Sequence, residues 1–237
     1  MQHRSKKIKK SFFIILVVLI VLSGGSAIYL GNYYHSVDVE KYMNGSSEVS
    51  VEKFDKGWFF DGAGEEKALI FYPGAKVATE AYAPLMYQLA ESGIDCFLVD
   101  MPFHMAFFGM NRAEEIMQEY NYEAWYLGGH SLGGAMAANF AADYVEDHTD
   151  GIRGLLLLAA YPTKDLSTSD MSVVTVYGSE DGVLNMDKIV AGRELMPQDY
   201  KEVCIEGGNH AQFGSYGTQK GDGTAAIPAE EQWARTG

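Results

Sequence analysis

The segment Ala124-Trp-Tyr-Leu-Gly-Gly-His-Ser-Leu-Gly-Gly134 decides the fold, because it joins a short apolar run to a glycine-rich turn. An alanine-rich stretch over residues 132–145 follows and is typical of a helix. The turn contains the pattern Gly-x-Ser-x-Gly, which holds a serine at a sharp bend between a strand and a helix. The pattern is common in glycine-rich chains, so its place between a predicted strand and a predicted helix carries the weight. We interpret Ser131 as a candidate nucleophile, and an ordinary glycine-rich turn is the alternative.

Apolar runs alternate with helical patterns along the chain on both sides of this segment. Short buried strands are predicted at 68–72, 94–99, 124–127, 155–160, 173–177 and 200–205, and helices at 82–89, 113–120, 132–145 and 185–196. Residues 49–60 alternate loosely and predict one or two edge strands. Strict alternation of strand and helix favours a mostly parallel central sheet with helices on both faces, so the predicted fold class is α/β.

A serine nucleophile needs a base, and the base needs a carboxylate that orients it. In hydrolases with this turn the chain order is serine, carboxylate, histidine. His210 lies in a glycine-rich loop directly after the last predicted strand, whereas His148 lies in a charged helix end. Asp181 comes just after another buried strand, with Glu180 as the competing carboxylate. We predict that Ser131, Asp181 and His210 are the catalytic residues.

The tetrahedral intermediate of such a reaction needs backbone N–H donors for its oxyanion. One donor belongs to the residue after the nucleophile, which here is Leu132. The second comes from the loop after an early strand, which here is Pro73-Gly-Ala-Lys76. We predict Ala75 as the second donor, and a simple turn is the alternative for this loop.

Four segments together resemble one known superfamily: Phe71-Tyr-Pro-Gly-Ala-Lys-Val77, Gly128-Gly-His-Ser-Leu-Gly-Gly134, Tyr177-Gly-Ser-Glu-Asp-Gly182 and Gly207-Gly-Asn-His-Ala-Gln-Phe-Gly214. From about residue 67 to 232 the chain resembles the α/β-hydrolases, and among them small lidless members such as dienelactone hydrolases and α/β-hydrolase family 5. The resemblance implies the α/β-hydrolase fold without a cap domain. It also implies the triad Ser131, Asp181 and His210, and a hydrolase that uses no metal and no cofactor.

Two features depart from the family pattern. The His-Gly pair common at the oxyanion loop is Pro73-Gly74 here, and the last helix, begun by Pro228, ends after a short run at Gly237. The connection Tyr161–Ser172 has 12 residues, which is too short for the helical cap that larger relatives insert there. We therefore expect an open site.

Composition bounds the class of protein. The 237 residues are 47% apolar and 21% charged with a net charge of −14, which fits one globular α/β domain and excludes wholesale disorder. The acidic balance argues against a nucleic-acid partner. Two cysteines are too few for a disulfide scaffold or a zinc ribbon. The resemblance places Cys96 and Cys204 on strands too far apart to pair, so we expect two free, buried thiols.

The charge is concentrated unevenly at the N-terminus. The first ten residues carry +5, so the remaining 227 carry −19. The nineteen residues of 12–30 contain no charged side chain, and a membrane-spanning helix needs about 20 mostly apolar residues. We expect a basic cytoplasmic tail at 1–10 and an uncleaved transmembrane anchor at 11–30, with the rest of the chain exported. The alternatives are a signal peptide cleaved near Ala27, which would release the domain, and a buried helix of a soluble core.

Residues 31–47 are polar and contain the turn signal Asn44-Gly45, so we expect a linker there and a folded domain at 48–237. Within that domain the loop Met101–Met110 is rich in methionine and phenylalanine. It could line an apolar acyl pocket, face the membrane or pack beneath the next helix, and His104 within it is expected to be structural.

These patterns predict a membrane-anchored, extracytoplasmic serine hydrolase that cleaves carboxylic esters through an acyl-enzyme on Ser131. Its partners would be a small-molecule ester or related acyl substrate and the membrane itself. A thioesterase, lactonase or amidase would use the same triad. A non-catalytic envelope module that uses the same scaffold for binding is the alternative of another class, since a fold does not fix a function.

Overall fold

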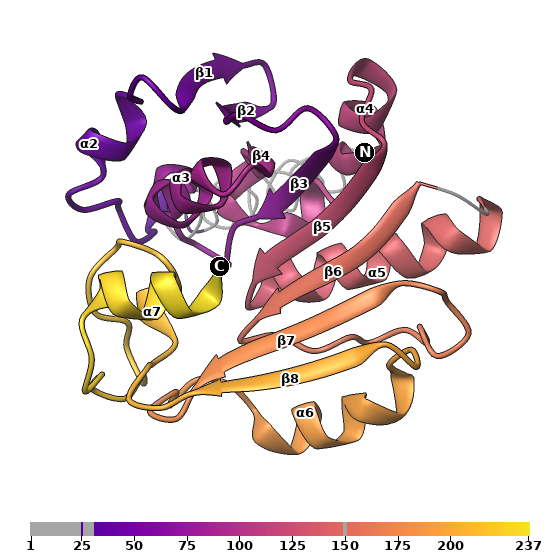
Figure 1. Ribbon diagram of the computed structural model, residues 1–237. Coiled ribbons are helices and arrows are strands. Elements are labelled where there is room, and N and C mark those ends of the chain that lie inside the picture. Colours follow the sequence, from indigo (N-terminus) through magenta and orange to yellow (C-terminus); the bar gives the residue numbers. More distant parts are fainter. Residues whose placement is uncertain (1–24, 26–30, 149–150) are drawn as a thin grey trace, which may run out of the picture. The chain divides into compact units, whose positions relative to one another are not determined.

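The computed structural model describes residues 25, 31–148 and 151–237 (Figure 1). The chain divides into two compact units, Met1–Tyr33 and Tyr34–Gly237, and the second contains the sheet. The predicted basic tail and, apart from Gly25, the predicted anchor lie outside the described residues. No helix within the described part of the chain is long and apolar enough to cross a membrane.

A single sheet of eight strands forms the centre of the second unit (Figure 1). Its spatial order is β1-β2-β4-β3-β5-β6-β7-β8, in which β2 pairs antiparallel with both β1 and β4 and all the other neighbouring pairs are parallel. The strands are β1 (Ser50–Phe54), β2 (Gly57–Asp61), β3 (Lys67–Tyr72), β4 (Asp95–Val99), β5 (Ala124–His130), β6 (Ile152–Leu158), β7 (Ser172–Gly178) and β8 (Tyr200–Ile205). The predicted mostly parallel α/β sheet is confirmed, and the edge strands expected within 49–60 are β1 and β2.

Helices cover both faces of the sheet, because the central strands are apolar on both sides. In β3 the side chains of Ala68 and Ile70 join the core beneath α4 and α5, whereas Leu69 and Phe71 join the core beneath α3. The helices are α2 (Glu40–Met43), α3 (Ala83–Glu91), α4 (Arg112–Glu119), α5 (Leu132–Asp147), α6 (Met186–Gly192) and α7 (Ala229–Thr236). Short 3-10 turns are η1 (Thr79–Tyr82), η2 (Pro102–His104), η3 (Ala106–Phe108), η4 (Arg193–Leu195) and η5 (Ala211–Phe213).

Residues 161–171, between β6 and β7, contain no helix. The connection therefore carries no cap domain, as its length predicted. Because parallel strands direct their carboxyl ends to one edge, the loops after β3, β5, β7 and β8 meet at that edge. They are the loops that contain the predicted site residues.

The expected linker at 31–47 is largely part of the folded unit, which begins at Tyr34 and not at residue 48. Tyr34 forms a parallel β-bridge with Val77, and Val39 is 6% exposed in the core beneath α3. Too few apolar residues lie in this polar segment to reveal its packing in the sequence.

One of the two thiols is not buried as expected. Cys96 on β4 is buried, but Cys204 on β8 is exposed, and both are free. Cys204 is exposed because β8 is the last strand of the sheet, where most residues are only partly covered. The strand contains the charged pair Lys201-Glu202, so the prediction of a buried strand rested on its second half alone.

Candidate functional site

The turn between β5 and α5 holds Ser131 in a strained backbone conformation. Its φ of 53° and ψ of −121° lie outside the regions that non-glycine residues favour, and such residues persist only where packing imposes them. The N–H of Ser131 donates to the carbonyl oxygen of Leu158 over 2.8 Å, which fixes the turn to the end of β6. The side chain is half-buried at the carboxyl edge of the sheet.

The glycines of this turn are required by close backbone contacts. A Cβ on Gly133 would lie 2.1 Å from the carbonyl oxygen of Tyr72, at the end of β3. A Cβ on Gly129 would lie 2.5 Å from the carbonyl carbon of Gly133. The pattern Gly-x-Ser-x-Gly is therefore the local condition for bringing β3, β5 and the start of α5 together.

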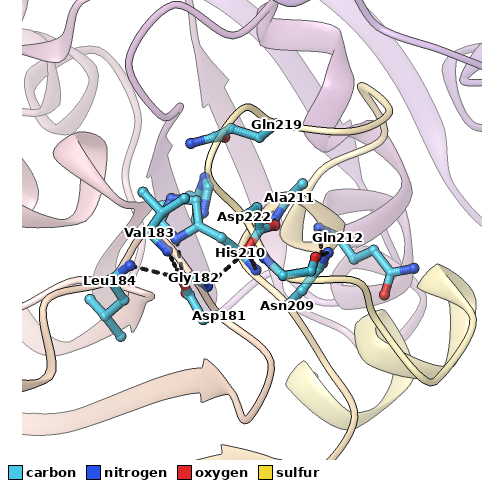
Figure 2. A network of polar contacts seen from close by, with 12 residues as sticks. Asp181, Gly182, Val183, Leu184, Asn209, His210, Ala211, Gln212, Gln219 and Asp222 are labelled. Atoms are coloured by element: carbon cyan, nitrogen blue, oxygen red, sulfur yellow. Dashed lines mark hydrogen bonds and ion pairs between the residues drawn. The ribbon is translucent and has the colours of Figure 1, made fainter.

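Asp181 and His210, which the sequence predicts to act together, lie in contact. Asp181 follows β7 and His210 follows β8, and Oδ2 of Asp181 lies 2.8 Å from Nδ1 of His210 (Figure 2). Both side chains are only 2% exposed. The other oxygen of Asp181 accepts the N–H groups of Val183 and Leu184 over 2.9 and 2.8 Å. The carboxylate is thus held in place by its own loop and can orient the imidazole.

The other ring nitrogen of His210 is available. Its Nε2 is buried and has no hydrogen-bond partner among the described residues. The ring packs 4.4 Å, centroid to centroid, from the ring of His130, which directly precedes Ser131. The structure therefore brings the three predicted residues to one edge of the sheet, and Nε2 of His210, unpartnered within the described ranges, lies on the side of the serine turn.

The competing residues lie elsewhere. Glu180 is exposed to solvent. His148 is exposed at the end of α5, where its ring stacks on Tyr144 at 4.1 Å and its Nδ1 contacts the carbonyl oxygen of Tyr144. Among the described residues, no hydrogen bond joins either side chain to Asp181 or His210.

Asp222 holds the two loops of the pair together, and sequence reasoning missed it. Its Oδ1 accepts the N–H groups of Gly182 and His210 over 3.1 and 3.2 Å, and its Oδ2 accepts the N–H of Ala211 over 2.8 Å (Figure 2). The N–H of Gly223 completes the set at 2.8 Å. The only sequence signal is an aspartate between glycines in Gly221-Asp-Gly223, which reads as an ordinary turn.

A second brace comes from α7. The fully buried Gln232 accepts the N–H of Asn209 over 3.0 Å and donates to the carbonyl oxygen of Asn209 over 2.8 Å. The side chain of Asn209 in turn donates to the carbonyl oxygen of Gly223 over 2.8 Å. The short last helix therefore fixes the backbone immediately before His210.

The two predicted oxyanion donors lie on the elements expected to supply them. Leu132 opens α5, and the first N–H groups of a helix have no partner within it, so they favour a negative charge. Ala75 is half-buried in the loop that follows β3. These positions fit oxyanion donation in chemistry and place.

A buried phenol links the oxyanion loop to the serine turn. The hydroxyl of Tyr82 accepts the N–H of Gly74 over 3.0 Å and lies 2.7 Å from Nδ1 of His130. The hydroxyl proton has no other acceptor within the described part of the chain, so we assign it to the bond with Nδ1, which is then unprotonated. Burial, and next the neighbouring His210, hold the pKa of His130 well below its usual value. His130 is thus a neutral spacer between Tyr82 and His210.

The loop Met101–Met110 follows β4 and divides into a buried and an exposed part. Met101 and Ala106 belong to the core beneath α4 and α5, as expected if the loop packs under the next helix. The side chains of Phe103, Phe107 and Phe108 are instead 56%, 67% and 55% exposed. Packing beneath a helix therefore does not account for the three phenylalanines.

Other potential sites in the described residues are less complete. No group of three or more His, Cys, Asp and Glu side chains is arranged there to hold a metal ion. A cleft of about 620 Å³ lies beside the His210 loop and is lined by Val37, Ala211 and Gln219 among others. Ser131, Asp181 and His210 do not line it, but Asp222, which accepts the N–H of His210, does.

Comparison with known proteins places the fold. The sequence profile of the Alpha/beta hydrolase family matches residues 68–234. No curated protein matches the chain significantly. Among solved structures, Est1E from Butyrivibrio proteoclasticus is 16% identical, with 80% of this chain and 96% of that chain covered at a TM-score of 0.55. Carboxyl esterase 2 from the mycorrhizal fungus Tuber melanosporum is 13% identical, with 86% and 90% covered at a TM-score of 0.59.

A putative hydrolase from Agrobacterium vitis S4 is also similar, with 14% identity, 70% of this chain and 93% of that chain covered, and a TM-score of 0.55. At these identities the similarity to solved structures concerns the fold alone. The family profile spans well over half of the chain and includes the serine turn, Asp181 and His210. The chain therefore belongs to the α/β-hydrolase family.

Proposed function

We propose that this protein is a serine hydrolase that cleaves carboxylic esters through an acyl-enzyme on Ser131. The observation that carries the proposal is the 2.8 Å contact between Asp181 and Nδ1 of His210. That contact leaves Nε2 buried and without a hydrogen-bond partner in the described part of the chain, at the edge where the strained turn carries Ser131. A carboxylate–imidazole pair next to a serine at a sharp turn is the arrangement that activates a hydroxyl as a nucleophile.

The proposed reaction begins when Oγ of Ser131 attacks the ester carbonyl carbon and passes its proton to Nε2 of His210. The carboxylate of Asp181 accepts a hydrogen bond from Nδ1–H of His210. The imidazole therefore presents its lone pair at Nε2, and its cationic form is stabilised. The N–H groups of Leu132 and Ala75 stabilise the oxyanion. His210 then gives its proton to the departing alcohol, and a water molecule, activated by the same histidine, hydrolyses the acyl-enzyme.

Two observations favour esters among acyl substrates. Residues 161–171 form no cap, so the site is open and suits small soluble or surface-bound esters. Several of the similar structures carry esterase in their descriptions, among them a carboxyl esterase and a bacterial heroin esterase. Thioesters, lactones and amides react with the same groups, so they form the comparison set in the assay.

The location of the enzyme is part of the proposal. The uncharged run 12–30 after five basic residues supports an N-terminal membrane anchor with its basic end inside and the hydrolase domain outside the cytoplasm. Intact mass of the membrane-extracted protein tests this directly. A mass for all 237 residues supports the anchor, and loss of the first 27 or so supports a cleaved signal peptide and secretion.

Labelling of the full chain with a fluorophosphonate, read by intact mass, tests the nucleophile. We expect one label per chain, abolished in Ser131→Ala and retained in the matched variant Ser215→Ala, whose half-buried serine hydrogen-bonds to the carbonyl oxygen of Val37. Turnover of 4-nitrophenyl esters should follow the same pattern. A folded, unlabelled wild-type protein would contradict the proposal and favour a non-catalytic binding module on the same scaffold.

A further inference from the structure

We propose that the phenylalanine loop (residues 103–108) lies against the lipid bilayer that holds the N-terminal segment, so that the site takes esters dissolved in the membrane. This inference rests on the proposed membrane anchor and goes beyond it, because it assigns one face of the hydrolase domain to the lipid surface. It also names the substrate class as lipophilic esters. The argument uses the exposed side chains, the backbone that presents them and the point where the chain enters the domain.

The phenylalanine loop exposes three aromatic rings side by side. Phe108 contacts Phe103 and Phe107 edge-on, with ring centroids 5.7 and 5.5 Å apart, although all three side chains are more than half exposed. Grouped exposed aromatic residues are uncommon on soluble surfaces and mark sites of contact with proteins, ligands or membranes. Phenylalanine has no polar atom that would favour water, so this group gains most from an apolar environment.

The backbone holds these rings outward at a strained turn. Phe103 and His104 have φ values of 57° and 54°, a left-handed conformation that non-glycine residues rarely adopt, and here two of them are consecutive. The carbonyl oxygen of His104 accepts the N–H of Lys76 over 2.7 Å, which ties the phenylalanine loop to the proposed oxyanion loop. A strained segment that persists next to a site and exposes apolar side chains indicates a function for their exposure.

The chain enters the domain at the same place. Tyr34 donates its N–H to the carbonyl oxygen of Lys76 over 2.7 Å and accepts the N–H of Ala78 over 2.8 Å. Lys76 therefore bonds through its N–H to the phenylalanine loop and through its carbonyl oxygen to the entering chain. The entry point, the phenylalanine loop and the loop with the proposed oxyanion donor all meet at one residue.

The length of chain before that point decides which partner covers the surface. The apolar run ends at Leu30, four residues before Tyr34, and a fully extended chain spans at most about 3.6 Å per residue. Once the run is inserted, Tyr34 cannot lie more than about 14 Å from its end. This short tether keeps the edge of the sheet that carries Lys76 close to the bilayer, which is the basis for assigning lipid, and not bulk water, to the aromatic cluster on that edge.

A fluorescence experiment on the full chain in vesicles tests this orientation. The environment-sensitive dye NBD is attached at Phe107→Cys in a Cys204→Ser background, since Cys96 is fully buried. The matched control is Val190→Cys on α6, which is 53% exposed. Phosphatidylcholine vesicles without net charge are used, because the chain after residue 10 carries −19 and anionic lipids would repel it.

We expect aqueous iodide to quench the dye at position 107 at least threefold less than at position 190, and nitroxide-labelled lipids to quench it more. Equal quenching at both positions in vesicle-bound protein would overturn the proposed orientation and leave the anchor intact. Failure of the chain to stay with the vesicles after alkaline extraction would overturn both the anchor and the orientation. Neither readout depends on catalysis.

Kinetics supply the second readout for the substrate class. In the same vesicles Phe107→Ser should lower the rate on a long-chain acyl ester dissolved in the bilayer at least fivefold. The rate on a water-soluble acetate ester should stay within twofold, and Val190→Ser should change neither. Equal loss on both esters would contradict membrane delivery. A wild-type protein inactive on both esters would contradict the proposed esterase activity, while the quenching result would still report on the orientation.

Discussion

The two loops that carry the proposed nucleophile and base are fixed in different ways. The Ser131 turn is fixed by its backbone, because the glycines at 129 and 133 let three elements touch. The His210 loop is fixed by side chains from elsewhere, since Asp222 and Gln232 bond to its backbone groups. The Ser131 turn depends on the absence of side chains at two glycines. The His210 loop depends on two polar side chains that must both be present.

The largest effect on catalysis is expected at the contact between the His210 loop and Asp181, in the variant Asp181→Asn. The amide keeps an oxygen for the N–H groups of Val183 and Leu184. Its NH₂ group would face Nδ1 of His210 and favour the wrong tautomer, so we expect kcat on soluble esters to fall on the order of 10⁴-fold with KM little changed. Steady-state kinetics measures this, with Glu180→Gln as the exposed neighbour. A loss below tenfold, or an equal loss in Glu180→Gln, would reject the assigned role.

The backbone-fixed loop is tested by Gly133→Ala. The new methyl group would lie 2.1 Å from the carbonyl oxygen of Tyr72, so β3 and α5 must separate. We expect the free energy of unfolding in urea to fall by about 3 kcal/mol, with loss of fluorophosphonate labelling. Gly31→Ala, where nothing lies within 4 Å of the added Cβ, is the control and should behave as wild type. A stable and fully active Gly133→Ala protein would show that close packing does not fix this turn.

The side-chain-fixed loop is tested by Asp222→Ala. Removing the carboxylate leaves the N–H groups of Gly182, His210, Ala211 and Gly223 without this partner. We expect a loss of about 2 kcal/mol in the free energy of unfolding and a lower kcat, because His210 is less firmly placed. Asp165→Ala is the control, since this exposed aspartate bonds locally to Ser167, two residues away. Kinetics equal to wild type would show that α7 and Asp181 suffice to hold the loop.

The same contrast explains what could be predicted from the sequence. Alternating apolar runs and the glycine pattern are local, so the sheet, its helices and the turn at Ser131 followed from the chain alone. Asp181 and His210 followed because their strands are apolar and their order is restricted. Nothing local distinguishes Asp222 or Gln232 from a turn aspartate or a helix glutamine, since their partners lie far along the chain.

The start of the folded domain, the edge of the sheet and the exposure of the phenylalanine loop could not be predicted from the sequence. Tyr34 and Val39 pack into the domain from a segment that is otherwise polar, so the segment reads as a linker. Cys204 lies in the run Val203-Cys-Ile205, which favours burial, but the position of its strand at the sheet edge is a property of the whole topology. The three exposed phenylalanines lie in a loop with two consecutive left-handed residues, Phe103 and His104. Neither is a glycine, so the sequence gives no sign of this backbone conformation.

The smallest expected effect is the pH dependence that His130 gives to the free energy of unfolding. His130 directly precedes Ser131, and its ring packs against the ring of His210. Burial first, and His210 second, hold the pKa of His130 well below the usual 6.5. The unfolded chain gains a proton on this histidine as the pH falls below about 6.5, whereas the folded protein does not. The unfolded state therefore binds more protons, and the free energy of unfolding must decrease as the pH falls. Above that range His130 contributes no pH dependence.

Urea unfolding between pH 8 and pH 5 measures this contribution. From pH 6 to pH 5 we expect wild type to lose up to about 1.4 kcal/mol more per pH unit than His130→Gln, with parallel curves above pH 7.5. Glu202, whose pKa is lowered to about 2, chiefly by its ion pair with Arg193, adds its own loss only below about pH 4.5. Burial also lowers the pKa of His104, so His104→Gln should remove a separate part of the slope. Identical slopes in wild type and His130→Gln would mean that the histidine between the two loops is charged in the folded protein, and that Tyr82 cannot donate to it.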